Sequence, residues 1–301
     1  MLRRTHVVMN NLWSTYKGIR FGFAFAALAW WSFLISIVTG ILLSFHYRPW
    51  GDVFKTVSFL SGFIPYGSFI RTLHYLSGQC FFIFTMAHLM EAFWNARYRA
   101  ISSKDWIKFT SIPVIASLLL FTGFILKGDK EGILAAGVMF HLIKGIPLIG
   151  SGLAQIFLRP GESLFLLPFI HHVVILPVMV LFLLVQHRRR LLPKGDLGWL
   201  FLAALSLLAM VYPMPADIPP HMELKTPSGP WFFQGVQFLL RYAPPLLGGI
   251  LWPLLPLLLM AVLPLIPLSC VSLARKTTII SLSVHGIFLL LAFWLIPRLG
   301  A

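Results

Sequence analysis

The sequence predicts an all-α transmembrane protein, a helical bundle with about seven spans. Of the 301 residues, 58% are hydrophobic and 11% are charged, and the mean hydropathy is +0.85, which is outside the range of an ordinary soluble domain. Apolar runs of transmembrane length recur, and backbone groups inside lipid must bond within the span, which favours helices. The expected spans are residues 21–46, 70–94, 108–126, 164–187, 197–212, 246–267 and 278–296.

The net charge of +15 would fit a nucleic-acid partner, but its distribution favours a membrane protein. With the N-terminus on the cytoplasmic side, the inner segments hold 14 of the 24 basic residues and 3 of the 9 acids (14 − 3 = +11), against 10 and 6 outside (10 − 6 = +4). This is the positive-inside pattern. The start, MLRRTHVVMNNLW, lacks the apolar core of a cleavable signal and predicts a basic interfacial segment. We expect an integral protein of a bacterial inner membrane that contacts lipid and no nucleic acid.

The second and fourth expected spans each carry a pair of histidines. His74 and His88 are fourteen residues apart, and His172 and His187 are fifteen apart. Each spacing is close to four helical turns, so both imidazoles of a pair leave their helix on nearly one face. His171 would be offset from the face of His187 by about 160° and His172 by about 60°, which favours His172.

A lone histidine in a membrane helix can simply bond a neighbouring carbonyl or line a polar cavity. Four at matched spacing in two helices are a functional signal, because ionisable groups inside a membrane are costly. Two facing helices that each offer an upper and a lower imidazole can hold two bis-histidine haems stacked across the bilayer. We therefore expect two haem b groups, with the iron ligands His74, His88, His172 and His187. The two cysteines, Cys80 and Cys270, form no CxxCH motif, so no covalent c-type haem is expected.

Two residues near the outer histidine are candidates for haem contact. Gly40 in the first span would permit the close approach of either a haem ring or a neighbouring helix. Arg71 precedes His74 by three residues, one turn outward on the same helix face. Its guanidinium can pair with a haem propionate at the membrane edge, which we favour over simple snorkelling to the interface.

The inner end of the second span carries an unusual acid. Glu91 follows His88 by three residues and is a candidate to handle protons near an inner quinone pocket, or to pair with a nearby cation. Arg97 and Arg99 in the following loop can bind the propionates of the inner haem or anionic lipid headgroups. Other candidate residues of the inner pocket are Arg20, Lys194 and Asp196.

The segment between the third and fourth spans is too polar and glycine-rich to cross a membrane, so we expect short interfacial helices there. They would cover the outer haem and form one wall of a quinone pocket, with Pro147, Trp231 and Phe232 as candidate wall residues. The chain changes character near residue 195. We therefore expect residues 1–195 to form a four-helix di-haem core and residues 196–301 to contribute three C-terminal helices.

Several motifs resemble the cytochrome b of respiratory bc and photosynthetic bf complexes. They are VTGILLSFHYRP, IRTLH with His88 fourteen residues on, IPLIGSGL, FIHHVVILP with His187 at fifteen, and PADIPP through PWFFQGVQFLLRYAPPLLG. The resemblance covers residues 10–297, and the fifteen-residue spacing is similar to the bf branch. It implies that His74 and His172 ligate the outer haem, that His88 and His187 ligate the inner haem, and that Arg71 holds an outer propionate.

The chain also departs from this family pattern. The PEWY motif, whose glutamate takes a proton from quinol, falls on residues 229–232, which read GPWF and lack the acid. The outer LPWG or LPWDQ stretch reads LKGDK, the cysteine for an extra inner haem aligns with Ala24, and an arginine is replaced by Glu91. These departures count against ordinary bifurcating quinol oxidation at the outer site. Alternative bases there are Asp129, Glu131, Asp217, His221 and Glu223.

The resemblance implies a quinol/quinone oxidoreductase function within a multi-protein complex. We expect a di-haem b subunit of a respiratory bc-type complex that carries electrons across the membrane between the quinone pool and c-type cytochromes on the periplasmic side. One alternative is a bifurcating complex with a Rieske-type iron-sulfur partner, and another is a non-redox membrane scaffold that retains haem. The family further suggests a dimeric complex.

Overall fold

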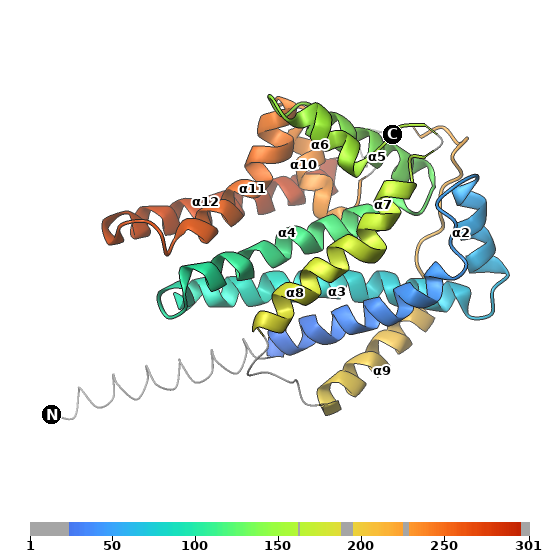
Figure 1. Cartoon of the computed structure of the whole chain (residues 1–301), viewed down its shortest axis with the longest axis horizontal. Helices are drawn as coiled ribbons and strands as arrows, with labels where there is room; N and C mark the ends of the chain where they lie inside the picture. Colours follow the sequence, from blue (N-terminus) through green and yellow to red (C-terminus); the bar gives the residue numbers. More distant parts are fainter. Residues whose placement is uncertain (1–23, 162, 188–194, 225–228, 296–301) are drawn as a thin grey trace.

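The computed structural model describes residues 24–161, 163–187, 195–224 and 229–295, and the regular secondary structure in these ranges is helical (Figure 1). The predicted interfacial segment at the N-terminus lies outside them. The first described helix runs from Ala24 to Ser44. The later helices are α2 (Val53–Gly62), α3 (Gly67–Trp94), η1 (Arg97–Arg99), α4 (Ser103–Ile125), α5 (Lys130–Lys144), α6 (Gly150–Phe157), α7 (Leu166–Ile170), η2 (His171–Ile175), α8 (Leu176–His187), α9 (Gly195–Val211), η3 (Trp231–Phe233), α10 (Gln234–Leu239), η4 (Leu246–Leu251), α11 (Trp252–Val262) and α12 (Leu268–Leu295).

Each of the seven predicted spans coincides with an apolar helix. Within the described residues, four helices are long and apolar enough to cross a membrane, namely Ala24–Ser44, α4, the continuous run Leu166–Leu184 and α12. A fifth crossing comes from α3, whose axis is bent by 109° from that of α2. The shorter apolar helices α9 and Leu246–Val262 correspond to the fifth and sixth predicted spans. The prediction of an all-α transmembrane bundle is confirmed.

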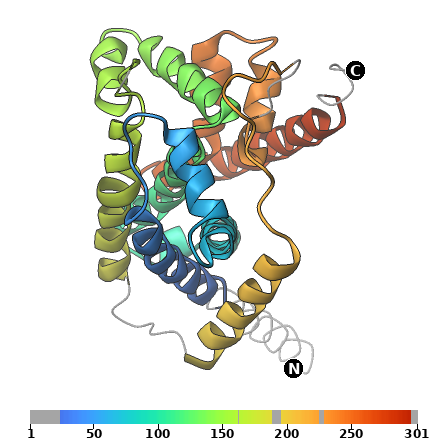
Figure 2. The same cartoon turned by 90° about the vertical axis from the view of Figure 1, so that its right-hand side faces the viewer.

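The first described helix, α3, α4 and α8 run side by side and form a four-helix core (Figures 1 and 2). Phe33, Phe93, Trp106 and Val180, one from each helix, are buried in a single apolar cluster. The Trp106 indole also donates a hydrogen bond from Nε1 to the carbonyl oxygen of Met260 at 2.7 Å. This bond fastens α11 to the outside of the core.

The C-terminal helices lie on two different sides of this core (Figures 1 and 2). Helix α9 packs against the first described helix and α3, where Leu205 shares a buried cluster with Ile35 and Leu73. Gly198 makes this approach possible, because a Cβ there would collide with the Trp31 ring. Helices α11 and α12 pack together, and α11 lies against α4. The proposed division at residue 195 stays a prediction.

In the part of the chain that the structure describes, both π-helical turns end two residues before a proline. The turn η2 precedes Pro177, and η4 precedes Pro253. Since proline has no N–H to donate, it interrupts the regular hydrogen-bond ladder of the helix. A π turn adds about one residue relative to an α-helix. The fifteen-residue spacing of His172 and His187 is therefore equivalent to the fourteen-residue spacing of His74 and His88.

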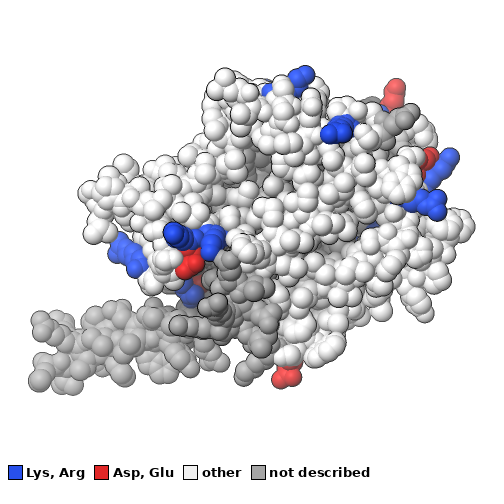
Figure 3. Space-filling model, viewed as in Figure 1, with Lys and Arg blue, Asp and Glu red and all other residues white. Residues whose placement is uncertain are grey.

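Charged side chains gather mainly towards the ends of the molecule, with uncharged surface between them (Figure 3). One end carries the turn between α3 and α4, which contains Arg97 and Arg99. The other end carries α2, α5, α6 and the segment that follows α9 (Figure 1). This distribution suits a protein whose long helices cross lipid and whose two ends meet water.

Candidate haem and quinone sites

The imidazoles of His74 and His172 face each other inside the core. His74 lies on α3 and His172 in η2, and their ring centroids are 5.9 Å apart with the ring planes at 74°. A metal ion bonded to one nitrogen of each ring at about 2 Å would place the centroids about 6 Å apart. The separation therefore fits two axial ligands of one haem iron.

The His74 ring is oriented by the first described helix. Its Nδ1 lies 3.1 Å from the carbonyl oxygen of Ser36 and 3.1 Å from Oγ1 of Thr39. When Nδ1–H donates to the carbonyl, Nε2 keeps its lone pair, and this is the tautomer that binds a metal. The hydrogen bond thus fixes both the ring orientation and the ligating nitrogen.

The His172 ring is oriented in the same manner by α4. Its Nδ1 lies 3.0 Å from the carbonyl oxygen of Leu119 and 3.1 Å from Oγ1 of Thr122. The same pattern orients both rings. In each helix, the threonine follows by three positions the residue whose carbonyl oxygen lies near Nδ1. Two different helices therefore present the two imidazoles with matching chemistry.

A glycine packs against each of these rings. A Cβ on Gly40 would lie 3.0 Å from Cε1 of His74, and a Cβ on Gly123 would lie 2.8 Å from Cε1 of His172. The structure thus places Gly40 against the candidate ligand itself. Sequence reasoning missed Gly123, although a Thr-Gly dipeptide occurs in both the first and the third expected span. That repeat was the available signal.

Of the second histidine pair, the structure describes the side chain of His88 alone. His88 is buried in α3 with 8% exposure, and its ring packs edge-on against Phe109 of α4 at a centroid distance of 5.0 Å. His187 is the last residue of α8, and its side chain lies outside the described residues. Haem ligation by these two residues stays a prediction.

Glu91 makes close contact with the inner loop. Its Oε1 accepts hydrogen bonds from Arg97 Nη2 and from Asn95 Nδ2, both at 2.7 Å, while Oε2 lies 4.0 Å from Nδ1 of His88. Arg97 is thus the cationic partner that the sequence left open. The Arg99 guanidinium lies 5.8 Å from the centroid of the Tyr98 ring. Among the suggested companions, Arg20 and Lys194 lie outside the described residues, and Asp196 is exposed in the first turn of α9.

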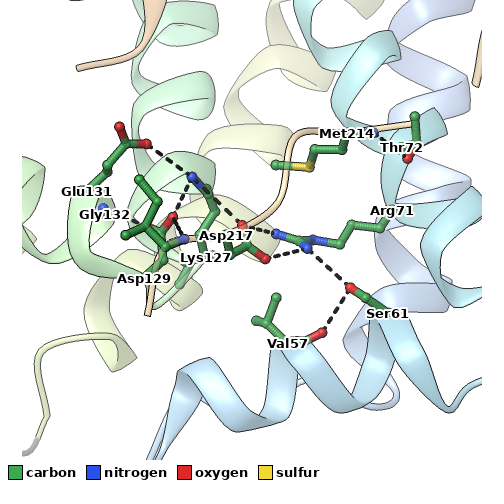
Figure 4. A network of polar contacts seen from close by, with 12 residues as sticks. Val57, Ser61, Arg71, Thr72, Lys127, Asp129, Glu131, Gly132, Met214 and Asp217 are labelled. Carbon is green, nitrogen blue, oxygen red and sulfur yellow. Dashed lines mark hydrogen bonds and ion pairs between the residues drawn. The ribbon is translucent and has the colours of Figure 1, made fainter. Parts of the chain in front are cut away.

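Arg71 forms a two-pronged ion pair with Asp217 (Figure 4). Nη1 lies 2.6 Å from Oδ2 of the carboxylate, and Nη2 lies 2.8 Å from Oδ1. Nη1 also donates to Oγ of Ser61 on α2 at 3.1 Å. Sequence reasoning gave Arg71 a haem propionate as its partner. That role stays a prediction, and any propionate here would share the guanidinium with Asp217.

Lys127 joins this ion pair to the start of α5. Its ammonium lies 2.6 Å from Asp129, 3.6 Å from Glu131 and 3.8 Å from Asp217. Three of the five residues suggested as alternative bases therefore meet around one lysine. Sequence reasoning did not bring them together, because Asp217 and Arg71 are 146 residues apart.

The suggested walls of the outer quinone pocket occupy different surroundings. Trp231 donates from Nε1 to Oε1 of Gln79 on α3 at 2.6 Å. Phe232 lies against Phe82 of α3, with ring centroids 5.9 Å apart, and packs on the apolar cluster at the α4–α5 junction. Pro147 is exposed in the turn between α5 and α6. Only the two aromatic residues therefore share a partly buried environment, against the ring of Phe82.

We expect Asp217→Asn to destabilise the protein. Asp217 and Arg71 are only 8% and 15% exposed, and removing one charge of a buried pair leaves the other uncompensated, at a cost of about 3 kcal/mol. Asp52→Asn is the control, since the Asp52–Lys55 pair is 52% and 83% exposed and asparagine caps a helix equally well, so the change should be below about 1 kcal/mol. Thermal unfolding of the two purified variants measures both. Equal midpoints would contradict the burial argument.

Comparison with known proteins agrees with this architecture. The family described as Cytochrome b/b6/petB matches residues 11–193. The cytochrome b6 of Heliomicrobium gestii is 24% identical over 170 residues, which cover 55% of this chain and 79% of that protein. The cytochrome b6 of Heliobacterium modesticaldum is 25% identical over 160 residues, covering 52% and 75%. A solved structure described as hyperthermophilic respiratory Complex III has a similar fold, with a TM-score of 0.63, 16% identity and 90% of each chain covered.

Proposed function

Because this chain belongs to the cytochrome b family, we propose that it is the di-haem b subunit of a respiratory bc-type complex. It carries electrons across the membrane between the quinone pool and c-type cytochromes on the periplasmic side. The facing imidazoles of His74 and His172, each held by a carbonyl, a threonine and a glycine, are the observation that supports this most strongly.

The protein's own residues prepare this site for electron transfer. Ser36 and Leu119 accept hydrogen bonds from the two Nδ1 atoms and so leave both Nε2 lone pairs available to ligate a metal. Haem b, when bound, supplies reversible one-electron chemistry. Gly40 and Gly123 allow the first described helix and α4 to lie close to the two imidazoles. A second haem would be held by His88 and His187.

The quinone sites and the partners follow from the same proposal. Quinol oxidation releases protons, so each quinone site needs ionisable groups near a haem edge. Glu91 is the candidate at the inner site, and Trp231 and Phe232 line the candidate outer site. The complex would be dimeric and would lie in a bacterial inner membrane with the N-terminus on the cytoplasmic side.

A quinol-reduction experiment on the purified complex tests the proposal. Mixing it with a quinol analogue should reduce b-type haem, seen as growth of the reduced absorbance bands. A haem-containing scaffold would show no reduction at useful rates. The alternative with outer-site bifurcation requires a Rieske-type iron-sulfur protein, whose cluster would be visible by electron paramagnetic resonance in the same preparation.

We expect Glu91→Gln to slow quinone turnover at least tenfold while leaving the haem spectrum intact. The substitution keeps an oxygen that can accept from Arg97, but it removes the group that exchanges a proton. Steady-state turnover and the reduced-minus-oxidised spectrum measure the two effects. Asp105→Asn, at an exposed acid on the same side, serves as the control. Unchanged turnover in Glu91→Gln would reject the proton-handling role.

A further inference from the structure

The start of α12 lies at the same end of the bundle as the α3–α4 turn, where Lys and Arg side chains reach the surface (Figures 1 and 3). Arg275 of α12 crosses this junction. Its Nη2 donates to the carbonyl oxygen of Trp94 at 3.3 Å, and its Nη1 donates to the hydroxyl of Tyr98 at 3.4 Å. The guanidinium also lies 5.2 Å from the centroid of the Phe93 ring. This side chain therefore connects α12 to the four-helix core.

All three of these contacts are with uncharged groups. Among the described residues, the guanidinium of Arg275 forms no ion pair with a carboxylate. The same is true, within those residues, of Arg99, whose guanidinium lies 5.8 Å from the centroid of the Tyr98 ring. Arg97 is different, because the Glu91 carboxylate compensates its charge at 2.7 Å. In the described part of the chain, two cations thus meet around one tyrosine without a counter-charge.

The Arg275 guanidinium has donors to spare. It carries five N–H groups, and the Trp94 carbonyl and the Tyr98 hydroxyl accept from two of them. Both bonds are longer than the usual N–H···O distance of about 2.9–3.0 Å, so they orient the group without saturating it. The planar fork of a guanidinium matches the oxygens of a phosphate, which it binds by charge-assisted hydrogen bonds.

The level of the junction along α12 corresponds to a boundary between lipid and water. The eighteen residues 277–294 contain no Asp, Glu, Lys or Arg. As a helix they span about 27 Å, close to the roughly 30 Å of a hydrocarbon core. Arg275 and Lys276 directly precede them and so lie at the level of lipid headgroups. Trp94, which is 67% exposed at the same end, is a residue type that favours this level.

Arg275 lies on a different side of α3 from the candidate inner haem ligand. Phe93, on which the guanidinium packs, follows His88 by five positions, a rotation of about 140° around the helix. Glu91, which pairs with Arg97, has its Oε2 4.0 Å from Nδ1 of His88. Arg97 is therefore the cation on the side of the candidate haem site, and Arg275 requires a different anion.

We propose that Arg275 and Arg99 bind the phosphate of an anionic phospholipid at this junction, and that the bound lipid strengthens the attachment of α12 to the four-helix core. The headgroup would supply the missing negative charge. Ile279, one turn further along the same face of α12, is exposed and can contact an acyl chain. Val271 of α12 is buried in the apolar cluster that contains Tyr98, so the lipid would reinforce an existing contact. The inference does not depend on the proposed redox function.

Lipid binding to the purified complex tests this site. Native mass spectrometry measures the affinity for phosphatidylglycerol, and thermal unfolding in a neutral detergent measures the stabilisation. We expect phosphatidylglycerol to raise the unfolding midpoint of the parent, and phosphatidylcholine or inorganic phosphate at the same concentration to leave it unchanged. In Arg275→Gln we expect at least a tenfold loss of affinity for phosphatidylglycerol, because a charge-assisted contact is removed, with unchanged haem content.

Two further variants make the test specific. Lys276→Gln removes the same charge from the next position, where the side chain is exposed, and should keep the parent affinity within about twofold. Arg99→Gln leaves the contacts of α12 intact and should lower the affinity at least threefold, so it tests the site even when Arg275→Gln does not fold.

Parental affinity in Arg275→Gln or in Arg99→Gln, or an equal loss in Lys276→Gln, would overturn the inference. An equal rise of the midpoint with phosphatidylcholine would do the same, because the charge would then be irrelevant. An equal rise with inorganic phosphate would show a site for free anions in place of a lipid site. Loss of haem from Arg275→Gln would assign the guanidinium to a propionate and would also overturn it.

Discussion

Replacing His172 with alanine is expected to remove one of two b haems from the purified protein. In the proposed site this side chain would supply one of the two iron-ligating nitrogens, and its ring centroid lies 5.9 Å from that of His74. Alanine offers no nitrogen, and the vacated space inside an apolar core provides no substitute ligand. Haem content per polypeptide, measured as the pyridine haemochrome, should fall by about half because the inner pair is untouched.

The neighbouring residue provides a matched control. His171 is buried with 6% exposure, its Nδ1 bonds the carbonyl oxygen of Leu167 at 2.8 Å, and its ring stacks on Phe157 at 4.8 Å. His171→Ala therefore removes an imidazole of equal size from the same turn of the same helix. It should lower the stability but retain both haems. Equal haem loss in the two variants would contradict the assignment of His172 as the ligand.

The spans were predictable because every segment that crosses lipid must be apolar and must satisfy its backbone hydrogen bonds within itself. Each of the seven apolar runs became a helix, including Leu246–Val262 with its internal prolines. The choice between His171 and His172 was also accessible from helical phase. The structure places His172, and not His171, opposite His74.

Other features depend on information that a local pattern does not contain. The phase offset calculated for His172 and His187 assumed a regular α-helix, whereas the π turn before Pro177 changes the number of residues per turn. The pairing of Arg71 with Asp217 joins segments 146 residues apart and follows from the tertiary fold alone. Gly123 was overlooked because a glycine in a membrane helix more often serves helix packing than ligand contact.

Gly123→Ala is expected to weaken haem binding at the His74–His172 site. The new methyl carbon would lie 2.8 Å from Cε1 of His172, so either the imidazole or α4 must move. The ring is held through Nδ1 to Leu119 on the same helix, so it has little freedom to retreat. Overpacking of this kind costs about 1–3 kcal/mol, which corresponds to roughly a 5- to 150-fold loss of haem affinity.

Haem retention during detergent washing and the electron paramagnetic resonance of the oxidised haem measure this effect, because the latter responds to the angle between the axial imidazoles. Gly78→Ala in α3 is the control, since its Cβ would meet only Leu120 at an ordinary 3.5 Å. Alanine is favoured over glycine in a helix by about 1 kcal/mol at both positions. Any haem loss confined to Gly123→Ala must then come from contact with the imidazole, and equal retention in both variants would show that the ring tolerates the methyl group.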